Sequence, residues 1–194
     1  MFSGIIKTIG KIKKRQMKNQ CLFLTIEKQN GWKIKPGDSI CTDGACLTVK
    51  TVGKNDYLTE LMPETLDKTY FAKTNYQYVN LEQSLKLNSL LDGHLVTGHV
   101  DTIGQIKKIT KQGNAKVCKI SFPKKFAKYV AEKASVAVDG ISLTIVEVGA
   151  DWFTVSLVDY TLQQTTIGQK KVGQLVHLEF DIIAKYLEKL IKPI

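Results

Sequence analysis

The sequence of 194 residues has very little arginine: Arg15 is the one arginine among its 28 basic residues, and the others are lysines. Arginine makes most of the bidentate contacts to DNA bases, so its near absence argues against sequence-specific nucleic-acid recognition, despite a net charge of +10. The lysines are scattered, with one cluster at 11–15, which is typical of solvated faces. We therefore expect no nucleic-acid partner, and a binder of single strands on a barrel fold is kept only as an alternative.

Long apolar runs are also missing. No stretch of about 18 apolar residues could span a membrane, and the first residues lack the apolar core of a signal peptide. The four cysteines have no CxxC spacing, which disfavours a zinc site and a secreted disulfide scaffold. These absences predict a cytoplasmic protein with free thiols and no membrane contact.

What the sequence does contain is an internal repeat. Residues 39–69 match residues 135–165 with 11 identities, where ordinary residue usage would give about two. Outside that window, "MFSG" at the start pairs with "LVTG" at residue 95, and "VNLE" at residue 79 pairs with "VHLE" at residue 176. The chain is therefore predicted to be two copies of one unit, residues 1–94 and 95–182, followed by a terminal segment, 183–194.

Each copy has the pattern of short antiparallel strands. "CTDGACLTVK" at 41–50 and "AVDGISLTIV" at 137–146 both place Asp-Gly between β-rich segments. This is a strong signal for a type I′ hairpin, in which both turn residues need positive φ. Further strands are expected at 21–28, 56–61, 76–82, 116–122, 151–157 and 174–180. About six short strands per copy indicate a small closed barrel without exposed edges. We predict an all-β fold of two tandem, similar six-stranded antiparallel Greek-key β-barrels.

Helical patterns are short. "PETLDKT" at 63–69 begins with a proline in a first-turn position, and "KKFAKYVAEK" at 124–133 precedes the second hairpin. At the end of the chain, apolar residues recur with helical spacing at Ile183, Tyr186, Leu187, Leu190 and Ile191. A terminal helix with such a stripe must either fold back or associate with copies of itself.

A duplicated barrel suits a protein that binds two molecules of one ligand, or two close relatives of it. Seven motifs, in order over essentially the full chain, resemble the riboflavin synthase family, whose members are homotrimers of subunits with two lumazine-binding barrels: "MFSGII", "GDSICTDGACLTV", "MPETLDKT", "VNLE", "GHLVTGHVD", "VAVDGISLTI" and "LEFD". The resemblance implies a dismutation, in which a four-carbon unit passes between two molecules of 6,7-dimethyl-8-ribityllumazine to give riboflavin and 5-amino-6-(ribitylamino)uracil. A non-catalytic lumazine- or flavin-binding protein is the alternative.

The resemblance also implies how the enzyme is assembled. It implies no metal and no organic cofactor, and the sequence has neither a P-loop nor a GxGxxG motif. It implies a homotrimer in which the first barrel of one subunit faces the second barrel of a neighbour, with the helix at 183–194 as the trimerisation element. Association with lumazine synthase is a further possibility that the sequence leaves open.

Positions where the two copies differ in chemical type are the candidates for catalysis. His99 stands opposite Ile5, and Ser142 opposite Cys46, so the second barrel is expected to hold most of the proton-transfer groups. We expect His99 to be the base, because an imidazole has an ordinary pKa near neutrality. Cys46 is expected to be a transient nucleophile or a polar wall. The catalytic candidates are Cys46, His99, Lys133, Ser142 and Asp181, together with Thr144, which is a threonine in both copies.

The remaining roles combine residue chemistry with the resemblance to the family. Ser142 and Thr144 are expected to hydrogen-bond the ring or to orient a water molecule, since an unassisted hydroxyl is a poor nucleophile. Lys133 and Asp181 match active-site positions of the family, so the resemblance implies that Lys133 stabilises negative charge and that Asp181 orients a hydroxyl or the ribityl chain. His94 is expected to have a positional or interface role, and His177 to face solvent.

The predicted substrate-binding residues come from both copies, and several would act through the backbone. Two departures from the family pattern lie in turns: Asp43 stands where asparagine is usual, and Ala134 where glycine is usual. The predicted substrate-binding set is Gly4, Ile5, Ile6, Cys46, Leu47, Thr48, Glu60, Leu61, Met62, Pro63, Glu64, Thr65, Gly98, His99, Val100, Lys133, Ser142, Leu143, Thr144, Leu157, Val158, Asp159, Tyr160, Thr161 and Leu162.

Overall fold

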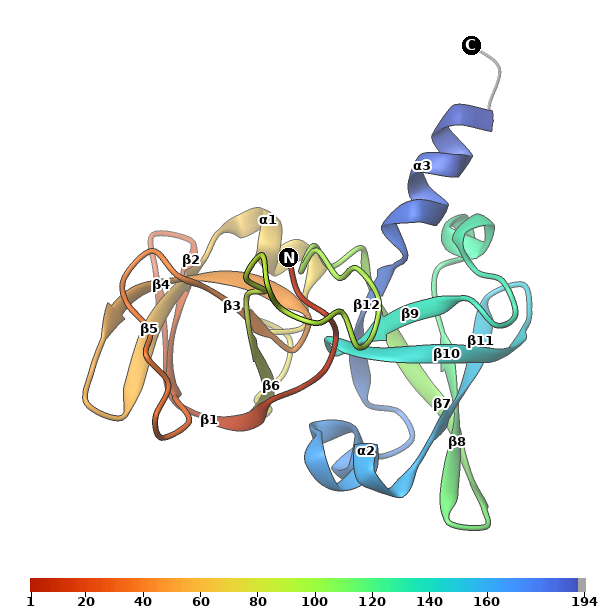
Figure 1. Ribbon diagram of the computed structural model, residues 1–194, viewed down its shortest axis with the longest axis horizontal. Helices are drawn as coiled ribbons and strands as arrows, with labels where there is room; N and C mark the ends of the chain where they lie inside the picture. The colour runs from red at the N-terminus through yellow and green to blue at the C-terminus, as the bar shows by residue number, and fades with distance from the viewer. Residues whose placement is uncertain (192–194) are drawn as a thin grey trace.

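The computed structural model describes residues 1–191 and contains two closed antiparallel barrels that lie side by side (Figure 1). Barrel 1 comprises β1 (Thr8–Lys18), β2 (Cys21–Glu27), β3 (Ser39–Thr42), β4 (Ala45–Val52), β5 (Asp56–Leu61) and β6 (Tyr78–Gln83). Barrel 2 comprises β7 (Thr102–Gln112), β8 (Ala115–Ser121), β9 (Ser135–Val138), β10 (Ile141–Val148), β11 (Trp152–Leu157) and β12 (Leu175–Phe180). The orders β1-β2-β5-β4-β3-β6 and β7-β8-β11-β10-β9-β12 are the same. The predicted all-β double barrel is confirmed.

Two strands were not predicted, and they are the longest. β1 and β7 open their barrels, and only their first halves alternate between buried and outward-facing residues. Their second halves are rich in lysine and extend as ribbons, β1 with β2 and β7 with β8. Lysine is depleted in strands, so this composition hid the strands from a reading based on apolar alternation. The six strands predicted outside the hairpins lie within two residues of their expected ends.

Each barrel encloses its own core, because alternate residues of every strand point inward. Leu24, Tyr57 and Leu81 are fully buried in barrel 1, and Phe153 and Val155 are fully buried in barrel 2. Each such side chain contributes roughly 1.5–3 kcal/mol to folding through the area it removes from water. The cores hold the hairpins β3–β4 and β9–β10 in place, and these hairpins carry Cys46 and Ser142.

Short helices follow equivalent strands in the two barrels. α1 (Pro63–Lys68) follows β5, as predicted, with a proline in its first turn. α2 (Asp159–Gln164) follows β11 at the matching place and was not predicted. The helix expected at 124–133 is a shorter 3-10 turn, η1 (Lys124–Tyr129), and a second such turn is η2 (Thr166–Gln169).

The last helix, α3 (Ile182–Ile191), projects away from both barrels (Figure 1). It contacts η1, and ion pairs join Lys128 to Glu188 at 2.8 Å and Lys185 to Asp101 at 2.6 Å. Its predicted apolar stripe, Ile183 to Ile191, is 52–78 % exposed, so the helix does not bury this stripe against its own barrels. Residues 192–194 of the predicted segment lie outside the described residues. No helix within residues 1–191 has the length and apolar character needed to cross a membrane.

The two repeats exchange their first residues. Phe2 and Val96 pair in an antiparallel bridge, with N–H···O distances of 2.7 and 3.1 Å. Beyond this bridge, the segment after Phe2 runs onto barrel 2, where Ile6 packs on the core, and the segment after Val96 runs onto barrel 1, where Val100 packs. The wall of each barrel therefore includes a short segment of the other repeat, which we call its borrowed segment.

The two hairpin turns meet back to back between the barrels. Asp43 and Gly44 have φ of 43° and 86°, and Asp139 and Gly140 have φ of 46° and 78°. Positive φ at both turn residues confirms the predicted turn geometry. A Cβ on Gly44 would lie 2.9 Å from the backbone nitrogen of Gly140, so glycine permits the close approach of the two turns.

A buried polar cluster joins the barrels beside these turns. The Tyr70 hydroxyl lies 2.8 Å from Asp43 Oδ2 and 3.1 Å from Asp139 Oδ1, while Lys170 Nζ lies 2.8 Å from Asp139 Oδ2. One hydroxyl proton cannot be donated to two carboxylates. Since Asp139 is paired with Lys170, we infer that Asp43 carries a proton and donates it to Tyr70. Burial, together with the charge of Asp139, raises the pKa of Asp43 to about 8.

His177 belongs to this cluster, and the prediction that it faces solvent was wrong. It is 1 % exposed, its Nδ1 lies 2.7 Å from the carbonyl oxygen of Asp43, and its Nε2 accepts the Tyr70 N–H at 2.8 Å. Its counterpart Asn80 hydrogen-bonds backbone groups of the second repeat in an equivalent way. The Asn80 side-chain amide donates to the Asp139 carbonyl and accepts the Thr166 N–H. Polar residues are needed here because each side chain satisfies buried backbone groups of the other repeat.

The protonated state of Asp43 predicts a pH dependence of stability. The folded pKa of about 8 exceeds the ordinary aspartate pKa of 3.8, so the contribution of Asp43 to stability falls as pH rises from about 4 to about 8. Burial lowers the pKa of His177 to about 4, which makes stability rise with pH up to about 6.5 and opposes the first slope. Between pH 6.5 and 8, the Asp43 slope is no longer opposed by that of His177.

We therefore expect the wild-type protein to lose about 1 to 2 kcal/mol of unfolding free energy between pH 6.5 and 8. The variant Asp43→Asn should not lose it, because the amide donates the same hydrogen bond to Tyr70 without titrating. Urea denaturation at both pH values measures the difference. If the unfolding free energy fell equally with pH in the two proteins, the assignment of the proton to Asp43 would be contradicted.

Candidate functional site

A cavity of about 450 Å³ opens on barrel 1 between the hairpin strand β4, the helix α1 and the borrowed segment at 98–100. We call it site 1. The hairpin contributes a thiol, the helix contributes hydroxyls and charges, and the borrowed segment contributes an imidazole. Its lining residues are Ala45, Cys46, Glu64, Thr65, Lys68, Thr69, Gly98, His99 and Val100.

Site 1 unites Cys46 and His99, which the sequence analysis had placed in different barrels. The expectation that the second barrel holds most of the proton-transfer groups was wrong for His99, because the crossing after Val96 carries it onto barrel 1. The Cys46 N–H donates to the Gly98 carbonyl at 2.7 Å, so the two segments are in direct contact. His99 is exposed, and Cys46 is partly buried. Both can therefore reach a ligand in the cavity.

Barrel 2 contains the equivalent arrangement, which we call site 2. By the correspondence of the repeats, it comprises Gly4, Ile5, Ile6, Ser142, Tyr160 and Thr161. The Ser142 N–H donates to the Gly4 carbonyl at 2.8 Å, just as Cys46 does to Gly98. Where site 1 has an imidazole, site 2 has the side chain of Ile5, so the two sites have the same backbone frame and different chemistry.

Site 2 obtains its own imidazole from the linker between the repeats. His94 Nδ1 lies 2.7 Å from Ser142 Oγ, within hydrogen-bond distance. Burial lowers the pKa of His94, against the opposing effect of the Asp181 charge. A neutral imidazole can accept the hydroxyl proton of Ser142, which is the arrangement that activates a serine or a water beside it. No local pattern in the sequence pairs these residues, which are 48 positions apart.

Asp181 lies at the start of α3, whereas Lys133 lies in the turn before β9. Asp181 Oδ1 accepts the Ile183 N–H at 2.9 Å, so it caps the start of α3, and its charge acts on His94. Lys133 is exposed in the turn before β9 and has φ of 66°, where its counterpart Gly37 has φ of 91°. The positive φ falls on Lys133 and not on Ala134, so the alanine at 134 does not strain the turn.

The other predicted residues differ in how far they are exposed. Thr48 and Thr144 are exposed on β4 and β10, two positions beyond Cys46 and Ser142 and thus on the same strand face. Four leucines, Leu47, Leu61, Leu143 and Leu157, are buried in the cores, so they can contribute to a site through the backbone. Glu60 is paired with Lys50. Met62, Pro63, Val158, Asp159 and Tyr160 are exposed around the starts of α1 and α2, and Leu162 is partly buried.

Two buried carboxylates were missed as functional groups. Glu82 and Glu179 end the motifs "VNLE" and "VHLE", which served above as markers of the repeat and of the family resemblance but not as candidate site residues. Each binds the start of a borrowed segment, Ser3 and Gly4 for Glu82, and Thr97 and Gly98 for Glu179. A charged residue at the end of an apolar strand is the signal that could have identified them.

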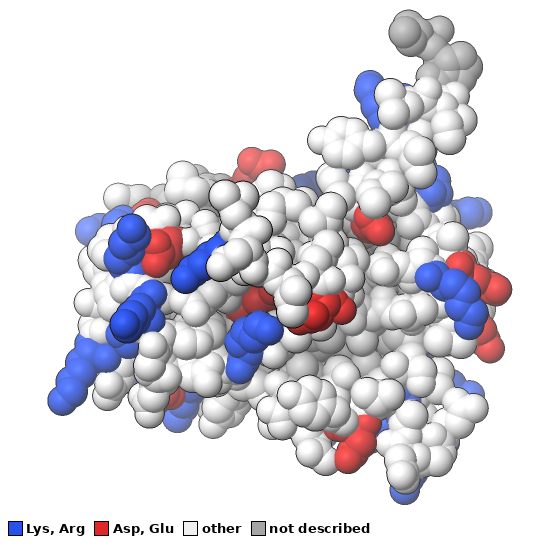
Figure 2. All heavy atoms as spheres, in the orientation of Figure 1, with Lys and Arg blue, Asp and Glu red and all other residues white. Residues whose placement is uncertain are grey.

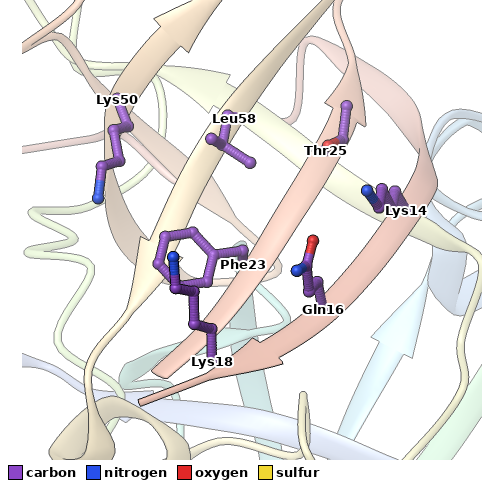
Figure 3. Close-up of a pocket in the computed structure, with 7 residues that line it drawn as sticks. All are labelled: Lys14, Gln16, Lys18, Phe23, Thr25, Lys50 and Leu58. Atoms are coloured by element: carbon purple, nitrogen blue, oxygen red, sulfur yellow. The ribbon is translucent and has the colours of Figure 1, made fainter. Parts of the chain in front are cut away.

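A second hollow lies on the outer face of barrel 1 (Figure 3). Lys50 Nζ lies 4.9 Å from the centre of the Phe23 ring and is also paired with Glu60. Figure 2 shows lysines spread over both barrels, as expected for solvated faces. The hollow shares no residue with the predicted site, since it is lined by Lys14, Gln16, Lys18, Phe23, Thr25, Lys50 and Leu58.

Comparison with known proteins gives consistent matches. A family model described as "Lumazine binding domain" matches residues 3–84 and 97–181. The riboflavin synthase of Mycobacterium bovis is 40 % identical, covering 99 % of this chain and 98 % of its own. Those of Actinobacillus pleuropneumoniae and Bacillus subtilis are 37 % and 35 % identical, each covering 98 % of this chain and 90 % of its own.

Solved structures of LumP show the same fold. LumP complexed with riboflavin has a TM-score of 0.86 at 22 % identity, over 93 % of this chain and 99 % of its own. LumP complexed with 6,7-dimethyl-8-(1'-D-ribityl) lumazine has a TM-score of 0.84 at 20 % identity, over the same shares of both chains.

The contact between Gly98 and Cys46 predicts a strong effect of one methyl group. A Cβ on Gly98 would lie 2.5 Å from Cys46 Cβ, and the residue has φ of 79°. We expect Gly98→Ala to destabilise the fold by about 2–5 kcal/mol, the sum of a left-handed alanine and overpacking. Gly37→Ala is the matched control, since φ is 91° there, nothing lies within 4 Å, and Lys133 occupies the equivalent turn. It should cost about 1–2 kcal/mol. Equal costs in urea denaturation would contradict the steric argument.

Proposed function

Because the chain belongs to the riboflavin synthase family, we propose that sites 1 and 2 each bind one molecule of 6,7-dimethyl-8-ribityllumazine and that the enzyme transfers a four-carbon unit between them. The products are riboflavin and 5-amino-6-(ribitylamino)uracil. Together they contain all the atoms of the two substrates, so the reaction balances without a further reactant. The observation that carries the proposal is the match to riboflavin synthases over nearly the whole of both chains.

The two sites support a reaction between identical substrates that need different treatment. Both present a similar backbone frame, which suits the same heterocycle. Site 1 adds Cys46 and His99, and site 2 adds Ser142 with His94 at 2.7 Å. The chemistry needs a base for the acidic 7-methyl group, a nucleophile that adds to the other ring, and donors that hold the delocalised anion. A different imidazole and a different nucleophile in each site meet that need.

We assign His99 as the base that takes the methyl proton of the lumazine in site 1, with Cys46 as the polar wall of that site or as the transient nucleophile that adds to the lumazine in the facing site. Ser142, activated by His94, orients a water or the ring in site 2, and Thr144 adds a hydroxyl on the same strand face. Lys133 stabilises negative charge, and Asp181 orients the ribityl chain or a partner hydroxyl. Site 1 of one subunit would face site 2 of a neighbour in a homotrimer. Association with lumazine synthase and a cytoplasmic location stay predictions from the sequence.

Turnover separates this proposal from a lumazine- or flavin-binding protein that does not react. Purified protein incubated with the lumazine should produce riboflavin, which is followed by its fluorescence, with an equal amount of the ribitylamino-uracil. Tight binding of the lumazine with no product would favour the binding protein. Two lumazines bound per chain are expected in a calorimetric titration, and a single binding event would contradict the two-site reading.

The role of His99 can be separated from binding. We expect His99→Ala to lower turnover by about 10²- to 10⁴-fold, the usual worth of a general base, while the lumazine dissociation constant changes only a few-fold. Steady-state kinetics and fluorescence titration measure the two quantities. His99→Gln keeps a polar side chain of similar reach and should show the same loss of turnover. Parallel losses in turnover and binding would show that His99 is structural.

The exposed stripe of α3 supports its predicted role in a trimer. Leu187 and Leu190 are 52 % and 78 % exposed, a large apolar area for a lone helix. Deleting residues 183–194, or introducing Leu187→Asp with Leu190→Asp, should convert the trimer to a monomer, which for the full-length double variant has a mass of about 21.7 kDa. Lys189→Asp on the same helix is the control and should leave the trimer intact. Light scattering gives the mass, and an unchanged mass after the deletion would refute this role.

A further inference from the structure

We propose that Glu179 and Glu82 are positioning residues that act across the two barrels. Glu179, in barrel 2, holds the segment that places His99 against Cys46 in site 1. Glu82, in barrel 1, holds the segment that places Ile5 against Ser142 in site 2. The inference rests on the proposed function for its kinetic consequence, although its structural part stands on hydrogen bonds alone.

The Glu179 carboxylate gathers three donors from the start of the borrowed segment. Its Oε1 accepts the Thr97 N–H and the Thr97 hydroxyl, both at 2.6 Å, and its Oε2 accepts the Gly98 N–H at 2.9 Å. The side chain is buried, with 3 % of its surface exposed. Both oxygens therefore face backbone N–H groups, which can only donate, and an ionised carboxylate fits this arrangement.

Glu82 repeats the arrangement in the other barrel. Its Oε1 accepts the Ser3 N–H at 2.8 Å and the Ser3 hydroxyl at 2.7 Å, and its Oε2 accepts the Gly4 N–H at 3.0 Å. It is 1 % exposed. Each carboxylate lies on the last strand of its own barrel, while the segment it holds continues onto the other barrel. The two positioning contacts are therefore crossed.

The held segments lead directly to the site walls. In site 1, the Gly98 carbonyl accepts the Cys46 N–H at 2.7 Å, and the His99 N–H donates to the Thr97 hydroxyl oxygen at 3.2 Å. The same hydroxyl donates to Glu179, so a chain of two hydrogen bonds joins the carboxylate to the backbone of His99. In site 2, the Ile5 N–H donates to the Ser3 hydroxyl in the same way, at 3.3 Å.

Replacing the carboxylate by an amide removes one of these contacts without removing the side chain. The amide nitrogen of glutamine can only donate, so it would oppose either the Gly98 N–H or the Thr97 N–H. The segment must then shift, and the imidazole of His99 shifts with it. A displacement of about 1 Å at a reacting group can lower turnover by about 100-fold.

The test uses Glu179→Gln and Glu82→Gln as matched controls for one another. Its structural readout is the alkylation rate of Cys46 by iodoacetamide, since Cys46 is the one cysteine of the four that is not buried. Glu179→Gln should change this rate several-fold, whereas Glu82→Gln should leave it within about 1.5-fold of wild type, because its effect falls on site 2. Mass spectrometry of the modified peptide identifies the thiol.

The kinetic readout follows the same division. Glu179→Gln should lower kcat by about 10- to 100-fold and shift the imidazole NMR signals of His99, while those of His94 stay in place. Glu82→Gln should shift the signals of His94 and leave those of His99 unchanged. Glu179→Asp, which retains the charge, should recover part of the kcat.

Two milder variants keep the test valid if a glutamine variant does not fold. Thr97→Val removes the hydroxyl link to His99 and keeps the backbone bonds to Glu179, and Ser3→Ala is its counterpart for site 2. The same crossed pattern is expected, with smaller effects. An equal change in Cys46 alkylation for both members of a pair, or no change in either, would overturn the inference. Because alkylation and NMR need no turnover, they test it even if the lumazine reaction is not observed.

Discussion

The close contact between the Gly44 and Gly140 turns sets the distance between the barrels, and the other inter-barrel features depend on it. With the turns back to back, Asp43 and Asp139 come near enough to share the Tyr70 hydroxyl, and Asn80 and His177 can reach backbone groups of the opposite repeat. The same approach brings Phe2 beside Val96, so the starts of the two repeats can pair and cross. A side chain at either glycine would push the two turns apart and so disrupt all of these contacts at once.

The crossing explains why neither site is made by one repeat. Site 1 joins the hairpin thiol of the first copy to an imidazole of the second, and site 2 joins the hairpin serine of the second copy to a segment of the first and a histidine of the linker. The buried carboxylates at the ends of β6 and β12 anchor the crossing strands where they leave their own barrel. The geometry of each site is therefore sensitive to residues in the other barrel.

Much of the fold follows from local signals in the sequence, whereas the site depends on contacts between distant residues. The Asp-Gly turns predicted the hairpins because only a few residues adopt positive φ, and alternating apolar residues predicted most of the strands. β1 and β7 were missed because their lysines hide the alternation. His177 was misjudged because the groups it satisfies belong to the other repeat, and His99 was assigned to the wrong barrel because the crossing leaves no local mark. The pairing of His94 with Ser142 likewise depends on the fold.

The exchanged segments give the two halves the symmetry of a pair of identical chains, with equivalent contacts at Gly4 and Gly98 and at Asn80 and His177. Two separate identical chains would carry the same residue at both members of every such position. Joining the halves into one polypeptide removes that restriction, so each position can change independently of its partner. Cys46 can then differ from Ser142, and Ile5 from His99, while the backbone that both sites share is preserved.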